Sequence, residues 1–319
     1  MNEIPFHRGL HRFAVVTAIA TLGLIGIGGL VTSKGAGMAV PDWPTTYGYN
    51  MFLFPIPMWK GGIFYEHTHR LYASCVGLLT VVLAVWIACV ETRPRMKWFG
   101  FAVVFLVALQ GTLGGLRVTL FKDQIGIVHA TLAQIFLVCM SALALATSRW
   151  WLRGESVRDG ARVPRGLVIA FGAVSFVMLT QLVLGASMRH QHAGLAIPDF
   201  PLAYGKLSPA TDPESILRYN QSRQEITALN PITATHIIHH MMHRITALIL
   251  YIAVALCVWR AKRLAGPRHP VTRAAWVWFA ILNLQILLGA ATVWSAKAAD
   301  VATAHVVTGA VALVTGSLI

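Results

Sequence analysis

The sequence predicts an all-α, polytopic membrane protein with eight transmembrane helices, arranged as two tandem pseudo-symmetric four-helix bundles. Three observations predict this fold. The 319 residues are 56% hydrophobic and only 12% charged, with a mean hydropathy of +0.64, whereas soluble domains average about a quarter charged residues. Apolar runs of transmembrane length recur along the chain, and a sequence motif of the first half returns in the second.

The apolar runs define the eight spans. A helix needs roughly 20 predominantly apolar residues to cross a bilayer. The runs of this length are 13–32, 64–90, 98–117, 125–147, 167–187, 234–259, 274–294 and 301–319. The first run is too long for the core of a signal peptide and no small-residue cleavage site follows it, so we expect a retained helix. The last run ends with the chain and has no polar tail, so we expect a sequence trimmed at this end.

The positive charge is concentrated in short loops on one side of the predicted membrane. The net charge is +14, which in a soluble protein would suggest nucleic acid as a partner. Fifteen of the 26 basic residues are Arg8, Arg12, Arg93, Arg95, Lys97, Arg149, Arg153, Arg158, Arg162, Arg165, Arg260, Lys262, Arg263, Arg268 and Arg273, all in these loops. This is the positive-inside pattern. It predicts cytoplasmic termini and explains the basic excess by topology and anionic lipid headgroups, without nucleic acid.

The cysteines argue against a disulfide framework. Cys75, Cys89, Cys139 and Cys257 all fall within predicted spans, and none lies in an outer loop. We therefore expect small, buried packing residues at these positions.

An internal repeat divides the chain. The motif G-x-A-x-P-D-[WF]-P-x-x-Y-G at 37–48 returns at 194–205, an offset of 157 residues. The segment 66–70 corresponds to 240–244 at an offset of 174, so the second outer loop has gained about 17 residues (174 − 157). The repeat predicts two units, 1–150 and 163–319, joined by an arginine-rich segment near 153–165. Each unit has an even number of spans, so the two should share one orientation. The outer-loop motif is either an ordered cap or a structural turn.

Four histidines occupy equivalent places in this repeat. His69, His129, His243 and His305 each lie near the start of a span that runs inward from the outer face. Polar groups inside a membrane are costly and usually mark a site. Two neutral imidazoles from facing helices are a common way to hold a heme in a helical bundle. The repeated pairs therefore favour two heme sites over single structural hydrogen bonds.

The repeat also selects among neighbouring residues. It equates His69 with His243, each followed by an arginine, whereas His67 aligns with Met241 and is the weaker candidate. Arg70 and Arg244 either pair with heme propionates or reach the membrane interface.

Other histidines are given lesser roles. His236, His239, His240 and His243, with Met241 and Met242, would by themselves suggest a copper or zinc site, but the first unit lacks this density. We expect ordinary surface residues at His7, His11, His190, His192 and His269.

Glu66 marks the difference between the two units, because it aligns with His240. A carboxylate one helical turn from a heme-ligating histidine is a candidate proton acceptor or water activator. The alternative is a hydrogen bond that orients the histidine. If one unit carries out chemistry and the other moves electrons, the first unit is the catalytic one.

At these residues the chain resembles the heme A synthase family, membrane enzymes that convert heme O into heme A. The resemblance covers nearly the whole chain. It rests on the eight spans in two halves, the glycine-rich end of the first span running into 37–44, the Glu-x-x-His-Arg signature at 66–70, and the paired histidines His129, His243 and His305.

The resemblance implies the following roles. His243 and His305 would hold a heme b as a fixed cofactor, and His69 and His129 would bind the substrate, heme O. Glu66 would assist oxidation of a porphyrin methyl group, by successive hydroxylations, to the formyl group of heme A for a terminal oxidase. The predicted site residues are thus Glu66, His69 and His129 as catalytic, His243, His305, Arg70 and Arg244 as cofactor-binding, and the four paired histidines as ligands of heme iron.

The resemblance also implies a setting, the inner (cytoplasmic) membrane of a bacterial cell. The implied partners are a heme O synthase, a cytochrome oxidase assembly factor and a membrane electron acceptor. Two alternatives stay open: a di-heme b-type cytochrome that only passes electrons, and a heme exporter or chaperone. A pure electron carrier has no use for a carboxylate beside one heme, so the presence of Glu66 favours the enzyme over the electron carrier.

The chain departs from the family at two places. Many members carry a cysteine pair around the first outer-loop motif, where this chain has Ala39, Val40 and Thr46. A thiol–disulfide role cannot operate here. Many members also have an arginine near the position of Thr32, where the nearest basic residue is Lys34. The sequence therefore leaves open which residues contact the substrate propionates.

Overall fold

Eight long helices make up most of the structure, a computed structural model that describes residues 6–152, 163–222 and 231–319. They are α1 (Arg8–Ser33), α2 (Gly62–Val90), α3 (Pro94–Leu120), α4 (Asp123–Ala146), α7 (Arg165–His190), α9 (Ala234–Leu264), α10 (Pro270–Trp294) and α11 (Ala299–Leu318). Each is long and apolar enough to cross a membrane. The described residues form no strand, only two isolated bridges. The all-α prediction with eight spans is confirmed.

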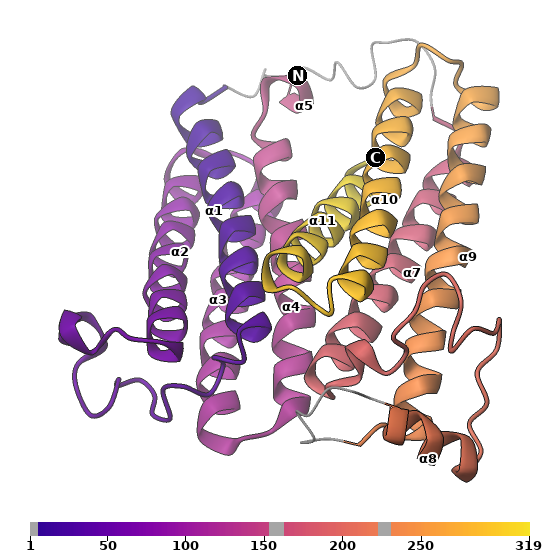
Figure 1. Cartoon of the computed structure of the whole chain (residues 1–319). Coiled ribbons are helices and arrows are strands. Elements are labelled where there is room, and N and C mark those ends of the chain that lie inside the picture. The colour runs from indigo at the N-terminus through magenta and orange to yellow at the C-terminus, as the bar shows by residue number, and fades with distance from the viewer. Residues whose placement is uncertain (1–5, 153–162, 223–230) are drawn as a thin grey trace.

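Most of the helices run roughly side by side, so most of the connections lie at two ends (Figure 1). The long loop 34–61 and the described parts of the second long loop, 191–222 and 231–233, lie at one end together with α8 (Pro213–Ser222). We call this the loop end. The short connection at 91–93 and the short helix α5 (Arg149–Leu152) lie at the opposite end, where α1 begins. The segment between the two predicted units lies mostly within 153–162, outside the described residues.

Helix contacts follow the internal repeat. In the first half α1 packs on α2 and α4, and α3 packs between α2 and α4; in the second half α7 packs on α9 and α11, and α10 packs between α9 and α11. Each half has its own apolar core, around Leu83 and Met140 in the first and around Trp278 and Leu250 in the second. The division into units 1–150 and 163–319 stays a prediction.

Small and branched residues join the two halves. Helix α1 packs on α11, and α4 packs on both α7 and α11. Ile25, Leu137 and Ala310 form a buried cluster at this junction. The four helices at the junction also carry His129, His305 and the C-terminal residues of α7 toward a common space.

Local sequence explains several helix ends. Pro94 and Pro270 occupy the first turn of α3 and α10, where the missing N–H is not needed and the fixed φ favours the helix. The Thr233 hydroxyl accepts the N–H of His236 at the start of α9, a typical N-cap.

Helix α8 was not expected from the hydropathy pattern, because it is short and polar. It lies in the segment that the second outer loop has gained. Tyr219 of α8 stacks on Tyr204 with ring centroids 3.6 Å apart, and the Asn220 amide accepts the N–H of Ile232 at 2.7 Å and donates to its carbonyl at 2.9 Å. These contacts fasten the insertion to the outer-loop motif.

The prediction for the cysteines is partly wrong. All four are free, but Cys75 and Cys89 are exposed on the outside of α2, and only Cys257 is fully buried. A transmembrane helix is apolar on its lipid-facing side as well, so the hydropathy of these runs could not distinguish a buried face from a lipid-facing one.

Candidate functional site

A large cavity lies within the helical assembly. Its volume is about 1370 Å³, larger than the roughly 300–1,000 Å³ typical of a site for one small ligand. All four paired histidines line it: His69, His129, His243 and His305. The cavity therefore has room for more than one ligand and is lined by both halves of the chain.

Each of the four histidines packs against a glycine of a neighbouring helix. The pairs are His69 with Gly28, His129 with Gly114, His243 with Gly185, and His305 with Gly289. A Cβ added at these glycines would lie 3.0, 3.4, 3.3 and 3.1 Å, respectively, from the Cε1 atom of the histidine ring. The glycines follow the internal repeat, at offsets of 157 (185 − 28) and 175 (289 − 114). A glycine on the neighbouring helix thus makes room for each of the four rings.

Glutamines fix three of the four histidine positions. Gln110 donates to the backbone carbonyl of His129 at 3.1 Å, and Gln181 donates to that of His243 at 2.9 Å. The ring Nδ1 of His305 lies 3.1 Å from the carbonyl oxygen of Gln285. Only a protonated Nδ1 can satisfy a carbonyl oxygen, so the lone pair of the His305 ring is on its Nε2, which lies 3.5 Å from the side-chain nitrogen of Gln285.

The histidine atoms fit heme iron. The Nδ1 atoms of His69, His129 and His243 are buried without a hydrogen-bond partner among the described residues, whereas their Nε2 atoms reach the surface of the cavity that the rings line. Nε2 is the usual ligating atom of an axial histidine. The rings therefore present one coordinating atom each to the same space.

A metal site with three or more protein ligands is absent from the described part of the chain. Among the described residues no group of three or more histidine, cysteine, aspartate or glutamate side chains is placed to hold a metal ion. Of the α9 histidines, His240 and His243 line the cavity, but His236 and His239 do not. This arrangement gives no support to the copper or zinc reading of the 236–243 segment.

His67 has a different environment from His69. It is fully buried, its Nδ1 lies 3.2 Å from the Thr46 hydroxyl, and its ring packs between Phe54 and Trp59. It does not line the cavity. The two-residue spacing places His67 under the outer loop and His69 in the cavity.

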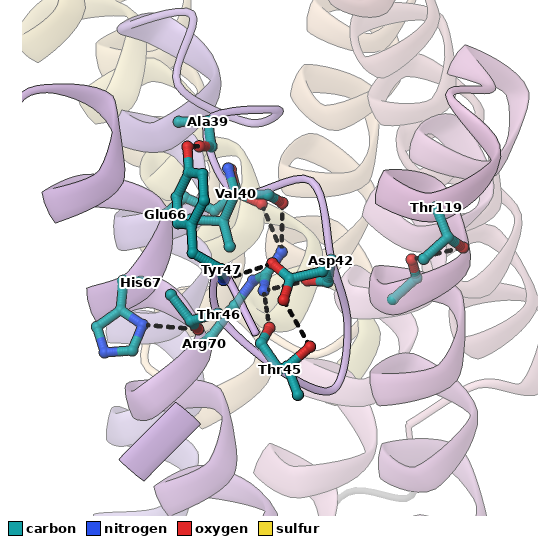
Figure 2. A network of polar contacts seen from close by, with 11 residues as sticks. Ala39, Val40, Asp42, Thr45, Thr46, Tyr47, Glu66, His67, Arg70 and Thr119 are labelled. Atoms are coloured by element: carbon teal, nitrogen blue, oxygen red, sulfur yellow. Dashed lines mark hydrogen bonds and ion pairs between the residues drawn. The ribbon is translucent and has the colours of Figure 1, made fainter. Parts of the chain in front are cut away.

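Arg70 fastens the first outer loop to α2, as Figure 2 shows. Its Nη1 donates to the carbonyls of Asp42 and Thr45 at 2.7 and 3.0 Å. Its Nη2 donates to the carbonyl of Val40 at 2.8 Å and to Glu66 Oε1 at 3.0 Å. One guanidinium thus satisfies three loop carbonyls and a buried carboxylate, which supports the ordered-cap reading of the motif.

Arg244 repeats this arrangement in the second half. It donates to the carbonyls of Leu202 and Asp199 at 2.8 and 2.6 Å. The sequence alone did not predict that both arginines bind the loops. Their contact with heme propionates stays a prediction.

Asp42 organises the loop from within. Its carboxylate accepts the N–H groups of Tyr47 and Gly48 and the hydroxyl of Thr45. Partial burial acts to raise the pKa of Asp42, but the hydrogen bonds from Gly48, Thr45 and Tyr47 outweigh it and hold the pKa below its usual value. Tyr47 and Gly48 both have positive φ angles of 50° and 78°, which suits the tight turn and explains the repeated Tyr-Gly pair.

Glu66 lies between this loop and the cavity. It is 4% exposed, and its Oε2 accepts the N–H of Val40 at 2.8 Å while Oε1 pairs with Arg70. It also lines the cavity. The aligned residue of the second half, His240, is 3% exposed and lines the same cavity. The loop therefore positions this carboxylate, which lies one turn before His69 on α2 and is the one acidic side chain among the described residues that line the cavity.

The prediction that His190 is an ordinary surface residue is wrong. Helix α7 continues three residues beyond the expected span end at 187, which brings His190 into the cavity lining, 8% exposed. The preceding residue, Arg189, also lines the cavity, and it donates to the Gly29 carbonyl and to the Ser33 hydroxyl of α1. Arg117 of α3 is a third basic residue there that the sequence reading missed.

Comparison with known proteins gives a consistent assignment. A family model described as cytochrome oxidase assembly protein, COX15-CtaA, matches residues 11–317. The chain is 30% identical over 216 residues to the heme A synthase of Shouchella clausii, covering 66% of this chain and 69% of that protein. It is 26% identical over 307 residues to the heme A synthase of Alkalihalophilus pseudofirmus, covering 94% and 92%. With the heme A synthase of Symbiobacterium thermophilum it shares 27% identity over 284 residues, covering 86% and 82%.

The family model matches almost the full length of the chain, and the structure brings two repeated histidine pairs to one cavity. This chain therefore belongs to the COX15-CtaA family of cytochrome oxidase assembly proteins, the heme A synthase family.

Proposed function

We propose that this protein is an oxidoreductase of heme A biosynthesis that oxidises a methyl group of heme O to the formyl group of heme A, by successive hydroxylations. The single observation that carries the proposal is the unequal cavity. Two histidine pairs related by the internal repeat line it, and the one acidic side chain among the described lining residues, that of Glu66, lies one turn before His69 of the first pair.

The second half is proposed to hold heme b as a resident cofactor through His243 and His305. Gln181 fixes the backbone at His243, and the Gln285 carbonyl orients the His305 ring for ligation through Nε2. When bound, the heme supplies one-electron chemistry. A hydrogen bond to the far nitrogen of a ligating histidine fixes its orientation and raises its basicity, as a permanent cofactor requires.

The first half is proposed to bind heme O between His69 and His129, and Arg70 and Arg244 remain candidates for contact with the heme edges. Gln110 donates to the His129 carbonyl as Gln181 does to that of His243, so the two pairs are held in similar ways. The assignment of the substrate to the first pair therefore rests on Glu66, which lines the cavity one turn before His69.

Glu66 is proposed to accept protons during the oxidation. Conversion of a methyl group into a formyl group adds one oxygen atom, and with water as the source of that atom it releases four electrons and four protons. The protons need an acceptor close to the reacting group. Glu66 lies one turn before His69 on α2 and lines the same cavity. Two hydrogen bonds hold its carboxylate in place, so it is positioned before substrate arrives.

No thiol takes part in the proposed mechanism. The positions where many relatives carry cysteines have packing and hydrogen-bonding roles here. The Ala39 carbonyl accepts the Tyr47 hydroxyl at 2.6 Å, and the Thr46 hydroxyl contacts His67. Electrons would leave through the second-half heme to a membrane acceptor, and the loop end would face away from the cytoplasm of a bacterial inner membrane.

The proposal is tested by extracting the hemes from membranes that contain this protein and a source of heme O. We expect heme A, with hydroxymethyl heme as its precursor, in the chromatogram. Membranes with the His69→Ala variant serve as the control and should contain heme O without either product. If folded wild-type protein gives neither oxidised heme, the chain is an electron carrier or a heme-binding protein instead of this enzyme.

A further inference from the structure

We propose that Arg117 binds a carboxylate of the porphyrin in the first half. The inference rests on the proposed function only for the class of ligand, a tetrapyrrole with carboxylate side chains. The site itself is built from charge, contacts and helix geometry at the loop end of the cavity.

The cavity has a strong excess of positive charge. Among the described residues that line it, Glu66 is the one acidic side chain, and five are arginine or lysine: Arg70, Arg117, Arg189, Arg244 and Lys297. Charges within a membrane are costly unless they are paired or solvated. A cavity of this composition favours an anionic ligand.

Most of these basic groups already have protein partners. Arg70 and Arg244 bind the loop carbonyls, and Arg189 binds α1. Arg117 makes no hydrogen bond or ion pair with any residue in the described part of the chain, although it is half-buried. The carboxylates of Glu66 and Asp123 attract its charge, but neither forms a hydrogen bond with it, so its five N–H donors are available to a ligand.

Two glycines make room for the Arg117 guanidinium. A Cβ at Gly37, at the start of the outer-loop motif, would lie 2.9 Å from its Nη2, and a Cβ at Gly126 of α4 would lie 3.0 Å from its Nε. Any larger residue at either position would displace the group. The ring of His190, from the second half, packs against the same Gly126. The guanidinium is thus held in a cradle formed by both halves.

The cradle lies close to the level of His129 along the axis of α4, within reach of a porphyrin bound there. Gly126 precedes His129 by three residues on α4, which corresponds to about 4.5 Å along a helix axis. Arg117 therefore lies one turn from His129 toward the loop end. A porphyrin ligated by His129 would extend its carboxylates to this level if its propionate edge points toward the loops.

The internal repeat explains why the proposed carboxylate-binding arginine of the first half, Arg117, comes from α3. Arg189 of α7 corresponds to Thr32 of α1 at the offset of 157 (189 − 32). The Thr32 hydroxyl donates to the Gly28 carbonyl of its own helix at 3.0 Å, so the first half has no cation at that position. Arg117 corresponds to Thr292 at the offset of 175 (292 − 117). Besides Arg70 and Arg244, which bind the loops, each half thus contributes one further arginine to the cavity, Arg117 from α3 and Arg189 from α7.

The test compares binding of ferric protoporphyrin IX with binding of its dimethyl ester, which carries no carboxylate charge. Purified full-length protein is titrated with each compound in the same detergent and followed by absorbance. We expect wild-type protein to prefer the free acid. In Arg117→Gln the free acid should bind roughly tenfold to hundredfold more weakly, the usual range for a charge-assisted hydrogen bond, while binding of the ester is unchanged. Arg117→Lys should retain part of the preference.

Lys122→Gln is the matched control. Lys122 is exposed at the same end of the molecule and does not line the cavity, so its removal tests whether general positive charge is sufficient. An equal loss of free-acid binding in this variant would overturn the inference. So would a wild-type protein that binds acid and ester equally, or an acid preference that persists in Arg117→Gln. None of these readouts requires turnover, so they are independent of whether heme A is formed.

Discussion

Gly28 of α1 and the His69 ring of α2 are in direct contact, and a Cβ at position 28 would lie 3.0 Å from Cε1 of His69. Gly28→Ala should therefore push the ring out of its position. We expect weaker binding of substrate heme and slower product formation, with an overpacking cost of about 1–3 kcal/mol in stability. The second-half heme spectrum should remain unchanged. The matched variant Gly185→Ala, next to His243, should instead alter that spectrum.

The second histidine pair should hold a permanent heme. His243→Ala and His305→Ala should each remove a low-spin heme that copurifies with the wild-type protein, as measured by reduced-minus-oxidised absorbance and heme content. His239→Ala is the control, because His239 is one turn away on α9 and does not line the cavity. Full low-spin heme content in both ligand variants would contradict this assignment.

Glu66 has hydrogen bonds that hold the loop as well as a proposed role as proton acceptor. Two substitutions distinguish the two roles. Glu66→Gln preserves the size of the side chain and an oxygen that can accept from Val40 or Arg70. It should keep the copurifying heme and the melting temperature near wild type, while product formation falls about 10²–10⁴-fold, the usual contribution of a general base. Glu66→Ala should lose product and also loosen the loop. Normal turnover in Glu66→Gln would exclude the proton-acceptor role.

Arg70 should stabilise the first outer loop, because it satisfies three of its carbonyls. Arg70→Gln leaves these groups and Glu66 without their partner, and we expect the free energy of unfolding to fall by about 2–4 kcal/mol. Amide hydrogen exchange across 40–48 should quicken, and exchange across the second motif at 194–205 should not change. Unaltered exchange across 40–48 would show that the loop is held by other contacts.

Asp42 gives the loop a pH dependence with a defined sign. Its pKa is lower in the folded protein than its ordinary value, so its contribution to stability is complete above that ordinary value and is lost as the pH falls through the lowered pKa. Amide exchange at 45–48, corrected for intrinsic rates, should therefore accelerate only at acid pH below the usual aspartate range. Asp42→Asn should remove this dependence.

The spans could be predicted from the sequence because hydropathy over roughly 20 residues is a strong signal. The repeat selected His69, which lines the cavity, over His67, which lies under the loop. Periodicity could not show which side of a uniformly apolar helix faces lipid, and the exposure of Cys75 and Cys89 was therefore missed. Arg117, Arg189 and His190 were missed because their importance depends on contacts between helices far apart in the sequence.

The polar contacts of the loops could not be predicted from the sequence either. Arg70 and Arg244 could be assigned to ligand carboxylates or to the interface, but their binding to backbone carbonyls follows from the turn that Asp42 and Asp199 organise. Helix α8 gave no periodic signal of useful length. One indirect signal existed for the missed cradle, since Gly37 opens the repeated outer-loop motif and a glycine can mark a place where a side chain approaches a backbone closely.

The most direct test of the account is a product analysis of purified protein that carries its resident heme and is supplied with heme O and an electron acceptor. Extraction and mass spectrometry at successive times should show hydroxylated heme O first and the formyl heme later, while the resident heme keeps its mass. Unmodified heme O throughout, in protein whose heme spectrum shows both sites filled, would contradict the proposal that the first half catalyses this oxidation.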